Sequence, residues 1–347
     1  MIHFKIISRI IGLLLLIEAL FMAGAFGVSL YCQENITSAY LYTLAATVAA
    51  GALFLYFGRG KERNISRKDG YIVVSLCWII FSIFGSMLYI FSGSIPSVTN
   101  AFFETMSGFS TTGATILDNI ESLPSSLLFW RAMTHWIGGL GIVFFTVAIL
   151  PIFGMGDIHL FAAEATGPIH GKLHPRISVT ARWILTIYIS LTIINALCLK
   201  FAGMNILDSV CHAMSTMATG GFSNKQASIE GYHSPVIEYI TVFFMFLGGT
   251  NFSLLYLTIF KGKFGELFRD SEFKCYANII LVATVAIMAG LLLTSSLGDP
   301  ERKPLTVAQF RNLAKRVQAA EKEISSRDLC VEDLLKLGYD IPMAQRI

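Results

Sequence analysis

Seven long apolar stretches constrain the fold of this chain more than any other feature. An apolar stretch of about 20 residues can cross the hydrocarbon core of a bilayer as a helix. The stretches cover residues 6–31, 39–57, 71–91, 127–153, 184–203, 239–260 and 276–297. Only 14% of the 347 residues are charged, whereas a soluble domain carries about 25%. We therefore predict an all-α membrane protein with about seven spans in the lipid bilayer.

Positive charge alternates between the loops that join these stretches. Lys and Arg precede the first stretch and recur in every second loop, which marks the cytoplasmic side of a membrane protein. These residues are Lys5, Arg9, Arg59, Lys61, Arg63, Arg67, Lys68, Lys172, Arg176, Arg182, Lys261, Lys263, Arg269 and Lys274. We predict a cytoplasmic N-terminus. The formal net charge of only +3 gives nucleic-acid binding no electrostatic support.

Two of the outside loops, residues 95–126 and 204–236, begin with apolar segments that are too short to span the membrane. The segments 100–109 and 206–217 are long enough for about three helical turns each, and their length is typical of re-entrant helices. Both end in a run of Thr, Gly and Ser. Candidate N-caps are Ser97 or Thr99 for the first helix and Asn205 or Asp208 for the second.

The two loops belong to an internal repeat. Four residues of the first loop recur 108 positions later and a fifth is replaced by a similar one, and the glycine pair at 138–139 recurs after 110 positions. The pairs in the loops are Met106 with Met214, Ser107 with Ser215, Thr111 with Thr219, Gly113 with Gly221 and Thr115 with the chemically similar Ser223. Each unit is a span, a half-helix, a Thr/Gly-rich segment and a second span, with both units in the same orientation.

The Thr/Gly-rich segments are suited to binding a cation that has lost its water. A half-helix entering from outside points its C-terminus, with its partial negative charge, toward the middle of the membrane. The segment that returns to the surface directs backbone carbonyls at the ion, as in potassium filters. The candidate ion-binding residues are Thr111, Thr112, Gly113, Thr219, Gly220 and Gly221. We predict a dehydrated alkali ion as the substrate and no covalently bound cofactor.

These segments, together with RAMTHWIGGLG at 131–141 and GPIHGKLHPR at 167–176, are similar to sequences of a known family. The chain resembles the Trk/Ktr/HKT superfamily of potassium transporters, most closely the bacterial TrkH type, over about residues 1–298. The resemblance implies potassium uptake through four repeats around one pore, with Gly113 and Gly221 as the central filter glycines. It also implies a homodimer in the bacterial inner membrane and a cytosolic nucleotide-binding regulator of the TrkA type.

The sequence departs from the family pattern after Gly298, because only two of the four repeats are present. The predicted organisation is two N-terminal transmembrane helices (1–62), a first pore repeat (63–176), a second pore repeat (177–270), the first helix of an incomplete third repeat (271–298) and a soluble helical tail (299–347). The tail carries nine Lys or Arg and eight Asp or Glu residues. This break in composition favours a foreign origin for the tail, by gene fusion or rearrangement.

Half a filter leaves several functions open. Either two chains pair and together supply four segments, or another polypeptide supplies the missing half, or the chain is a non-conducting fragment. A secondary transporter of another ion is an alternative, although inverted repeats are typical of that class and both copies here run in the same direction. An intramembrane enzyme based on His135 would need a catalytic motif such as GxSxG or HExxH, and the sequence has neither. We predict that the protein is not an enzyme.

Several polar and small residues in the apolar regions have structural interpretations. We expect Glu18, in the first span, to face protein or water because a carboxylate is costly in lipid. Glu104, whose counterpart in the second repeat is His212, should brace the filter from behind through buried hydrogen bonds rather than contact the ion. The glycines of the second span in each repeat should allow close helix packing; they are Gly138, Gly139, Gly141, Gly248 and Gly249.

Overall fold

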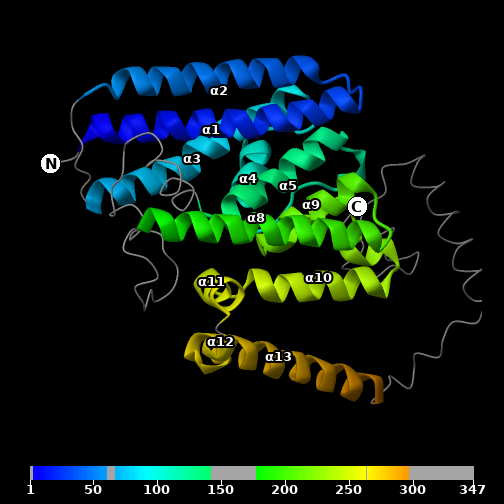
Figure 1. The fold of residues 1–347 in the computed structure, drawn as a ribbon. Helices are drawn as coiled ribbons and strands as arrows, with labels where there is room; N and C mark the ends of the chain where they lie inside the picture. Colours follow the sequence, from blue (N-terminus) through cyan, green and yellow to red (C-terminus); the bar gives the residue numbers. More distant parts are fainter. Residues whose placement is uncertain (1–2, 61–66, 142–176, 263, 297–347) are drawn as a thin grey trace, which may run out of the picture. The chain divides into compact units, whose positions relative to one another are not determined.

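The computed structural model describes residues 3–60, 67–141, 177–262 and 264–296, and helices are the regular elements within these ranges. The chain divides into two compact units, Met1–Tyr276 and Ala277–Ile347. The helices, labelled in Figure 1, are α1 (Phe4–Tyr31), α2 (Thr37–Phe57), α3 (Arg67–Phe91), α4 (Val98–Phe109), η1 (Ile120–Ser122), α5 (Ser125–Gly139), α8 (Ile177–Phe201), α9 (Ile206–Met217), η3 (Ser228–Tyr232), α10 (Pro235–Gly248), α11 (Phe252–Lys261), α12 (Phe264–Arg269) and α13 (Ser271–Ser296).

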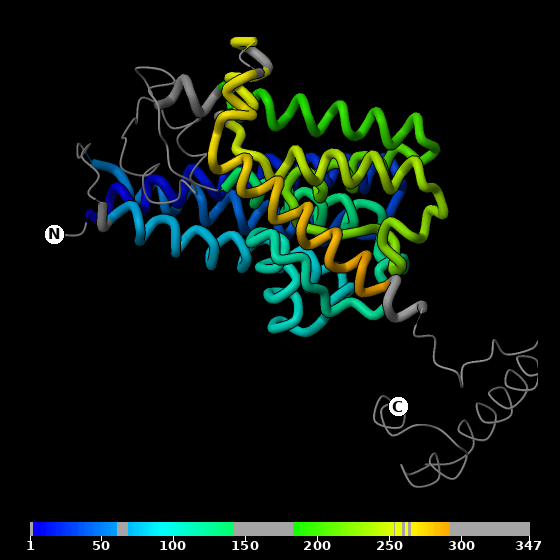
Figure 2. The backbone as a smooth tube through the Cα atoms, turned by 90° about the horizontal axis from the view of Figure 1, so that it is seen from below, coloured from blue at the N-terminus to red at the C-terminus, as the bar shows by residue number. Residues whose placement is uncertain are grey.

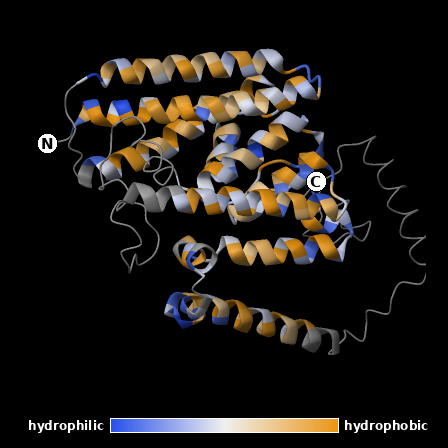
Figure 3. Ribbon diagram, in the orientation of Figure 1, coloured by the Kyte–Doolittle hydropathy of each residue, from blue (hydrophilic) through white to orange (hydrophobic). Residues whose placement is uncertain are grey.

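Five helices of the described part are long and apolar enough to cross a membrane. These segments are Phe4–Tyr31, Thr37–Phe57, Asp69–Phe91, Trp183–Phe201 and Ser271–Leu291. Apolar residues predominate along them, and hydrophilic residues gather at helix ends such as the start of α1 (Figure 3). They coincide with the first, second, third, fifth and seventh predicted spans.

The other two predicted spans differ from the structure. The prediction of a continuous helix over 239–260 is wrong, because α10 ends at Gly248 and α11 begins at Phe252. The intervening Gly249, Thr250 and Asn251 are weak helix formers, a signal outweighed by the apolar residues on either side. Of the predicted span 127–153, α5 covers the first part and ends at Gly139. Residues 142–153 of that span, the 167–176 motif and the tail 299–347 lie outside the described residues.

Helices α1, α2 and α3 contact one another in the first unit. A Cβ added to Gly12 of α1 would lie 2.8 Å from the carbonyl oxygen of Gly51 in α2, so paired glycines let these backbones approach closely. The carboxylate of Glu18 is fully buried and lies beside Gly85 of α3, where an added Cβ would be 3.2 Å from Glu18 Oε1. The prediction that Glu18 avoids lipid and faces protein is confirmed.

The chain doubles back between α3 and α5, and α4 occupies the turn (Figure 2). Both re-entrant helices begin at a predicted cap. Ser97 Oγ accepts a hydrogen bond from the backbone N–H of Asn100 at 3.4 Å, and Asn205 Oδ1 accepts one from Asp208 at 2.7 Å. Each cap satisfies an amide that would otherwise lack a partner in the first helical turn.

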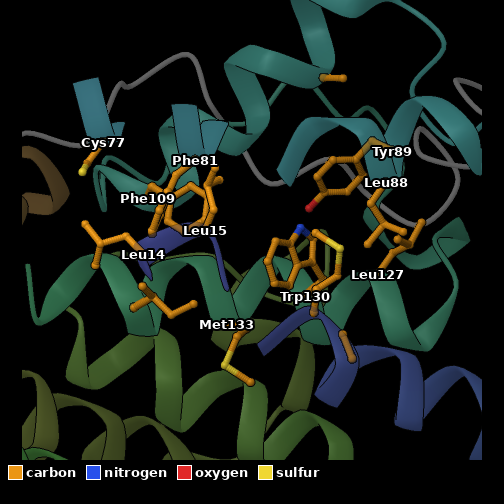
Figure 4. Close-up of a cluster of buried hydrophobic side chains, with 14 of the residues drawn as sticks. Leu14, Leu15, Cys77, Phe81, Leu88, Tyr89, Phe109, Leu127, Trp130 and Met133 are labelled. Atoms are coloured by element: carbon orange, nitrogen blue, oxygen red, sulfur yellow. The ribbon is translucent and has the colours of Figure 1, made fainter. Parts of the chain in front are cut away.

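An aromatic cluster fixes the C-terminal end of α4 (Figure 4). The Phe109 ring lies 5.5 Å from Phe81 of α3 and 6.3 Å from Trp130 of α5, measured between ring centroids. Phe109 and Trp130 are fully buried. Because aromatic side chains bury large areas and tolerate little displacement, this cluster holds the point at which the chain leaves the first re-entrant helix.

The two Gly-Gly pairs make equivalent contacts in the two repeats. An added Cβ at Gly138 would collide with the carbonyl oxygen of Phe109, and one at Gly248 would lie 3.0 Å from that of Met217. Phe109 and Met217 are the last residues of α4 and α9. The predicted role in close packing is therefore confirmed at Gly138 and Gly248, and in both copies the helix also ends at the glycine pair.

Candidate cation filter

Two segments with closely matching backbone conformations follow the re-entrant helices. We call residues 111–115 the first filter segment and residues 219–223 the second. Thr111 and Thr219 have φ of 55° and 52°, and Gly113 and Gly221 have φ of 75° and 89°. Positive φ is uncommon for threonine and readily adopted by glycine. Both segments therefore have positive φ at their first and third residues, and their backbones turn in the same way.

The same hydrogen bonds start both segments. The N–H of Thr112 donates to the carbonyl of Ser107, and the N–H of Gly220 donates to that of Ser215, both at 3.0 Å. Thr111 and Thr219 likewise donate to the carbonyls of Gly108 and Thr216, at 3.1 and 3.0 Å. These bonds turn the chain back at the C-terminal ends of α4 and α9, where the helix dipole is negative.

The two segments lie side by side. A Cβ added to Gly113 would collide with the carbonyl oxygen of Gly220, so these backbones are in contact. At Gly221 an added Cβ would meet nothing within 4 Å, and the residue is exposed, as are Thr112 and Thr219. Thr111 and Gly113 are half-buried, whereas Gly220 is buried. The structure thus brings the six predicted residues into one region, with open space beside Gly221.

Glu104 braces the first segment from behind. Its carboxylate is buried and accepts hydrogen bonds from the Thr115 hydroxyl at 2.9 and 3.1 Å and from the backbone N–H of Ile116 at 3.0 Å. The side chain of Ser107 adds a 2.6 Å bond to the carbonyl of Ala114. The carboxylate therefore holds the end of the segment, as predicted.

A network around His212 braces the second segment. His212 Nε2 lies 3.4 Å from the Ser223 hydroxyl and 3.2 Å from the hydroxyl of Tyr232, whose ring packs edge-on against the imidazole. Burial raises the pKa of Tyr232, and the nearby Asp208 carboxylate raises it further, so the phenol stays protonated. Asp208 Oδ1 in turn accepts a 2.8 Å hydrogen bond from Asn224.

Arg131 of α5 joins the two segments. Its Nε donates to Glu104 Oε1 at 2.7 Å, and its Nη1 donates to the backbone carbonyl of Ser223 at 2.9 Å. The guanidinium carbon also lies 3.5 Å from the centroid of the Phe222 ring. Arg131 is only 2% exposed, so one buried cation contacts the brace of the first segment and the backbone of the second.

Two further contacts connect the repeats. The imidazole of His135 stacks on Phe222 with 3.9 Å between centroids, and its Nδ1 lies 3.2 Å from the hydroxyl of Ser215. Beyond the segments, the backbone N–H of Ile120 donates to Gln226 Oε1 at 3.2 Å. These contacts hold His135 as a packing residue between the two copies.

Sequence reasoning missed Arg131. The residue belongs to the RAMTHWIGGLG run, but the run served only to carry a family resemblance. The available signal was an arginine among apolar residues of a predicted span, because an intramembrane cation requires a partner of opposite charge. Glu104, already singled out, was the acidic residue to pair with it.

The fold and this site define a class: membrane proteins in which re-entrant half-helices hold carbonyl-rich loops side by side. A family model described as TrkH, cation transport protein, matches residues 34–296. The chain belongs to the TrkH family of cation transport proteins, and the family assignment made from the sequence is confirmed.

Individual relatives agree with this assignment. The chain is 37% identical over 285 residues to the Trk system potassium uptake protein TrkH of Salmonella typhimurium, which covers 82% of this chain and 59% of the relative. It is 32% identical over 281 residues to TrkG of Escherichia coli K12, covering 80% of this chain and 58% of that protein. The crystal structure of the potassium transporter TrkH from Vibrio parahaemolyticus matches with a TM-score of 0.73 and 33% identity, covering 85% of this chain and 60% of that one. The chain thus spans about 60% of the length of these relatives.

Proposed function

We propose that this chain forms part of a potassium uptake pathway, in which the backbone carbonyls of Thr111, Thr112, Gly113, Thr219, Gly220 and Gly221 replace the water around the ion. The observation that carries the proposal is the contact between Gly113 and Gly220. It places two segments of matching conformation side by side at the C-termini of two half-helices, where partial negative charge and carbonyl oxygens favour a cation.

Potassium is proposed as the cation from the relatives, because those of Salmonella and Escherichia coli are named potassium uptake proteins. Neutral carbonyl ligands suit transport because they bind an ion without the full charge that would hinder its release. The Glu104 carboxylate is consistent with neutral ion ligands, since it accepts hydrogen bonds from Thr115, Ile116 and Arg131. We propose a transporter function rather than an enzymatic one.

We further propose that the pathway is completed by segments beyond those of one such chain. In this proposal residues 63–176 and 177–270 are the two pore repeats, and two-fold pairing of chains supplies a ring of four segments. A dimer measured by light scattering in detergent is the expected result, and a monomer that still transports would overturn the pairing. A cytosolic nucleotide-binding regulator of the TrkA type would act from the inner side; nucleotide-independent flux in its presence would remove it.

The direct test is uptake of radioactive rubidium into proteoliposomes of the purified chain. We expect uptake above that of empty vesicles, competed by unlabelled potassium and much less by sodium. The matched control is Gly27→Ala, because an added Cβ at Gly27 meets nothing within 4 Å, and it should transport like the wild type. Uptake equal to that of empty vesicles would establish a non-conducting fragment and overturn transport by this chain alone.

The proposed location is the bacterial inner membrane, with a cytoplasmic N-terminus. Two exposed cysteines test this orientation, since Cys32 follows α1 and Cys275 lies at the start of α13. In single-cysteine variants, a membrane-impermeant maleimide added to spheroplasts should label Cys32 and spare Cys275. The reverse pattern would invert the topology.

A further inference from the structure

Arg131 occupies a position where a cation has a high energetic cost. It lies in α5, inside an apolar segment of the chain, and its side chain is 3% exposed while that of Glu104 is fully buried. Burying an ion pair costs desolvation energy on both partners, and well-packed apolar residues often serve stability equally well. A role beyond stability would explain why a charged pair occupies this position.

The geometry of the guanidinium indicates what that role is. Through Nε it binds Glu104, whose carboxylate holds Thr115 at the end of the first filter segment and Ile116 just after it. Through Nη1 it binds the backbone carbonyl of Ser223 in the second filter segment. We propose that Arg131 is a positioning residue that sets the spacing between the two filter segments. The consequence for ion selectivity rests on the proposed function, whereas the spacing itself does not.

Arginine is chemically suited to this position and lysine is not. The planar guanidinium presents donors in a fixed fork, which bonds in two directions at once and stacks on an aromatic ring. Here the fork reaches a carboxylate and a carbonyl while its central carbon lies 3.5 Å from the Phe222 ring centroid. An ammonium group on a flexible stem keeps the charge but loses the fixed angle between the two bonds.

The second repeat has no equivalent cation at this place. The 110-residue offset of the second spans aligns Arg131 with Thr241, whose hydroxyl donates to the carbonyl of Ile237 within its own helix. One arginine therefore serves both segments. A role confined to the stability of the first repeat would not require the bond from Arg131 to the backbone of the second repeat.

The first experiment measures the spacing without requiring transport. Asp118 and Ala227 are exposed and lie just beyond the two segments. Spin labels are attached at Asp118→Cys and Ala227→Cys in a background whose native cysteines are serines. The labelled chains are diluted with excess unlabelled chains, so that the distance distribution measured in proteoliposomes is that within one chain. We expect one narrow distribution for the wild-type Arg131 and a broadened, shifted one for Arg131→Lys. The control Arg59→Lys alters an exposed arginine after α2 and should leave the distribution unchanged.

The second experiment measures the consequence. In the Arg131→Lys variant, the ratio of rubidium to sodium uptake should fall about tenfold, as expected from losing one hydrogen bond to a charged group, while rubidium uptake itself persists. A merely structural role would lower the amount of active protein and leave the ratio unchanged.

The outcomes separate the two proposals. If wild-type chains carry no rubidium, the proposed function fails, but the spin-label distances still decide the role of Arg131. If Arg131→Lys fails to insert into the membrane, both measurements are made on Glu104→Gln instead. This variant removes the ion pair between Arg131 and the residue that braces the first filter segment, and it keeps the bond from Arg131 to Ser223. Unchanged distances in the inserted variant would overturn the positioning role. An unchanged uptake ratio in a chain that transports would overturn its consequence for ion selectivity.

Discussion

The two repeats share a backbone conformation and differ in the residues that support it. Thr111 and Gly113 in the first repeat, and Thr219 and Gly221 in the second, have matching positive φ. Behind this backbone the first repeat places the carboxylate Glu104 and the second places His212, at equivalent positions. The part that would contact the ion is therefore held constant, while the support is free to change as long as it keeps the segment in place.

The supports also differ in strength. Glu104 makes charge-assisted bonds as short as 2.7 Å with Arg131, whereas the contacts of His212 with Ser223 and Tyr232 measure 3.4 and 3.2 Å. Charge-assisted hydrogen bonds are roughly twice as strong as neutral ones. The second segment compensates by resting on the first repeat, through Arg131 and His135. The first repeat thus acts as the support for both.

Replacing each brace by alanine should separate the repeats most clearly. Glu104→Ala leaves Arg131 buried without its counter-charge, which costs about 3–5 kcal/mol. His212→Ala removes neutral contacts, each of which contributes about 0.5–1.5 kcal/mol. The free energy of unfolding in a denaturing-detergent titration should therefore fall much further for Glu104→Ala. The isosteric Glu104→Gln serves as the control for side-chain volume, and equal losses for Glu104→Ala and His212→Ala would show that the supports are equivalent.

Alanine substitutions of the two filter glycines, Gly113 and Gly221, should have the next largest difference in effect between the repeats. Alanine at either Gly113 or Gly221 must adopt positive φ, at about 1–2 kcal/mol. Only Gly113→Ala also drives a Cβ into the carbonyl of Gly220, and overpacking adds about 1–3 kcal/mol. Gly113→Ala should lower both the thermal stability in detergent and the rubidium-to-sodium uptake ratio more than Gly221→Ala does.

Gly27→Ala provides the reference for the glycine variants, because it adds a Cβ in open space on α1. It should leave both thermal stability and uptake ratio unchanged. A larger effect at Gly221 than at Gly113 would contradict the close approach of the two segments.

The repeat, its half-helices and their caps were predictable because they depend on local sequence. The segment 206–217 was predicted at the same bounds as α9, since a cap, a short apolar run and a Gly-containing stop mark its ends. The matched Thr and Gly residues predicted equivalent segments in both repeats. Local signals suffice when hydrogen bonds join residues that are close in the chain.

Contacts between distant residues were not predictable in the same way. Arg131 and Ser223 are 92 residues apart, and no periodicity connects them. The different surroundings of Gly113 and Gly221 arise because the segments pack against each other asymmetrically, which a repeat pattern read from sequence cannot express. The break after Gly248 was hidden by apolar residues on both sides, so hydropathy predicted a single span.

The caps offer the smallest and most specific comparison. Ser97→Ala loses a 3.4 Å bond to Asn100 and should cost about 0.5 kcal/mol, the low end for a cap. Asn205→Ala loses a 2.7 Å cap bond and a 2.7 Å bond from its Nδ2 to Asp208 Oδ2, and should cost about 2 kcal/mol. Both losses are measured by thermal unfolding in detergent.

The larger loss of stability expected for Asn205→Ala matters for the site because Asp208 also binds Asn224, the residue next to the second filter segment. Asn205→Ser separates the two contributions, since serine keeps a capping oxygen and lacks the amide that binds Asp208. It should restore helix stability while leaving the second segment loosened, seen as faster hydrogen exchange around residue 224. Full protection in Asn205→Ser would show that the cap and the filter segment are independent, so that the contacts from Arg131, His135 and His212 suffice to hold the second segment.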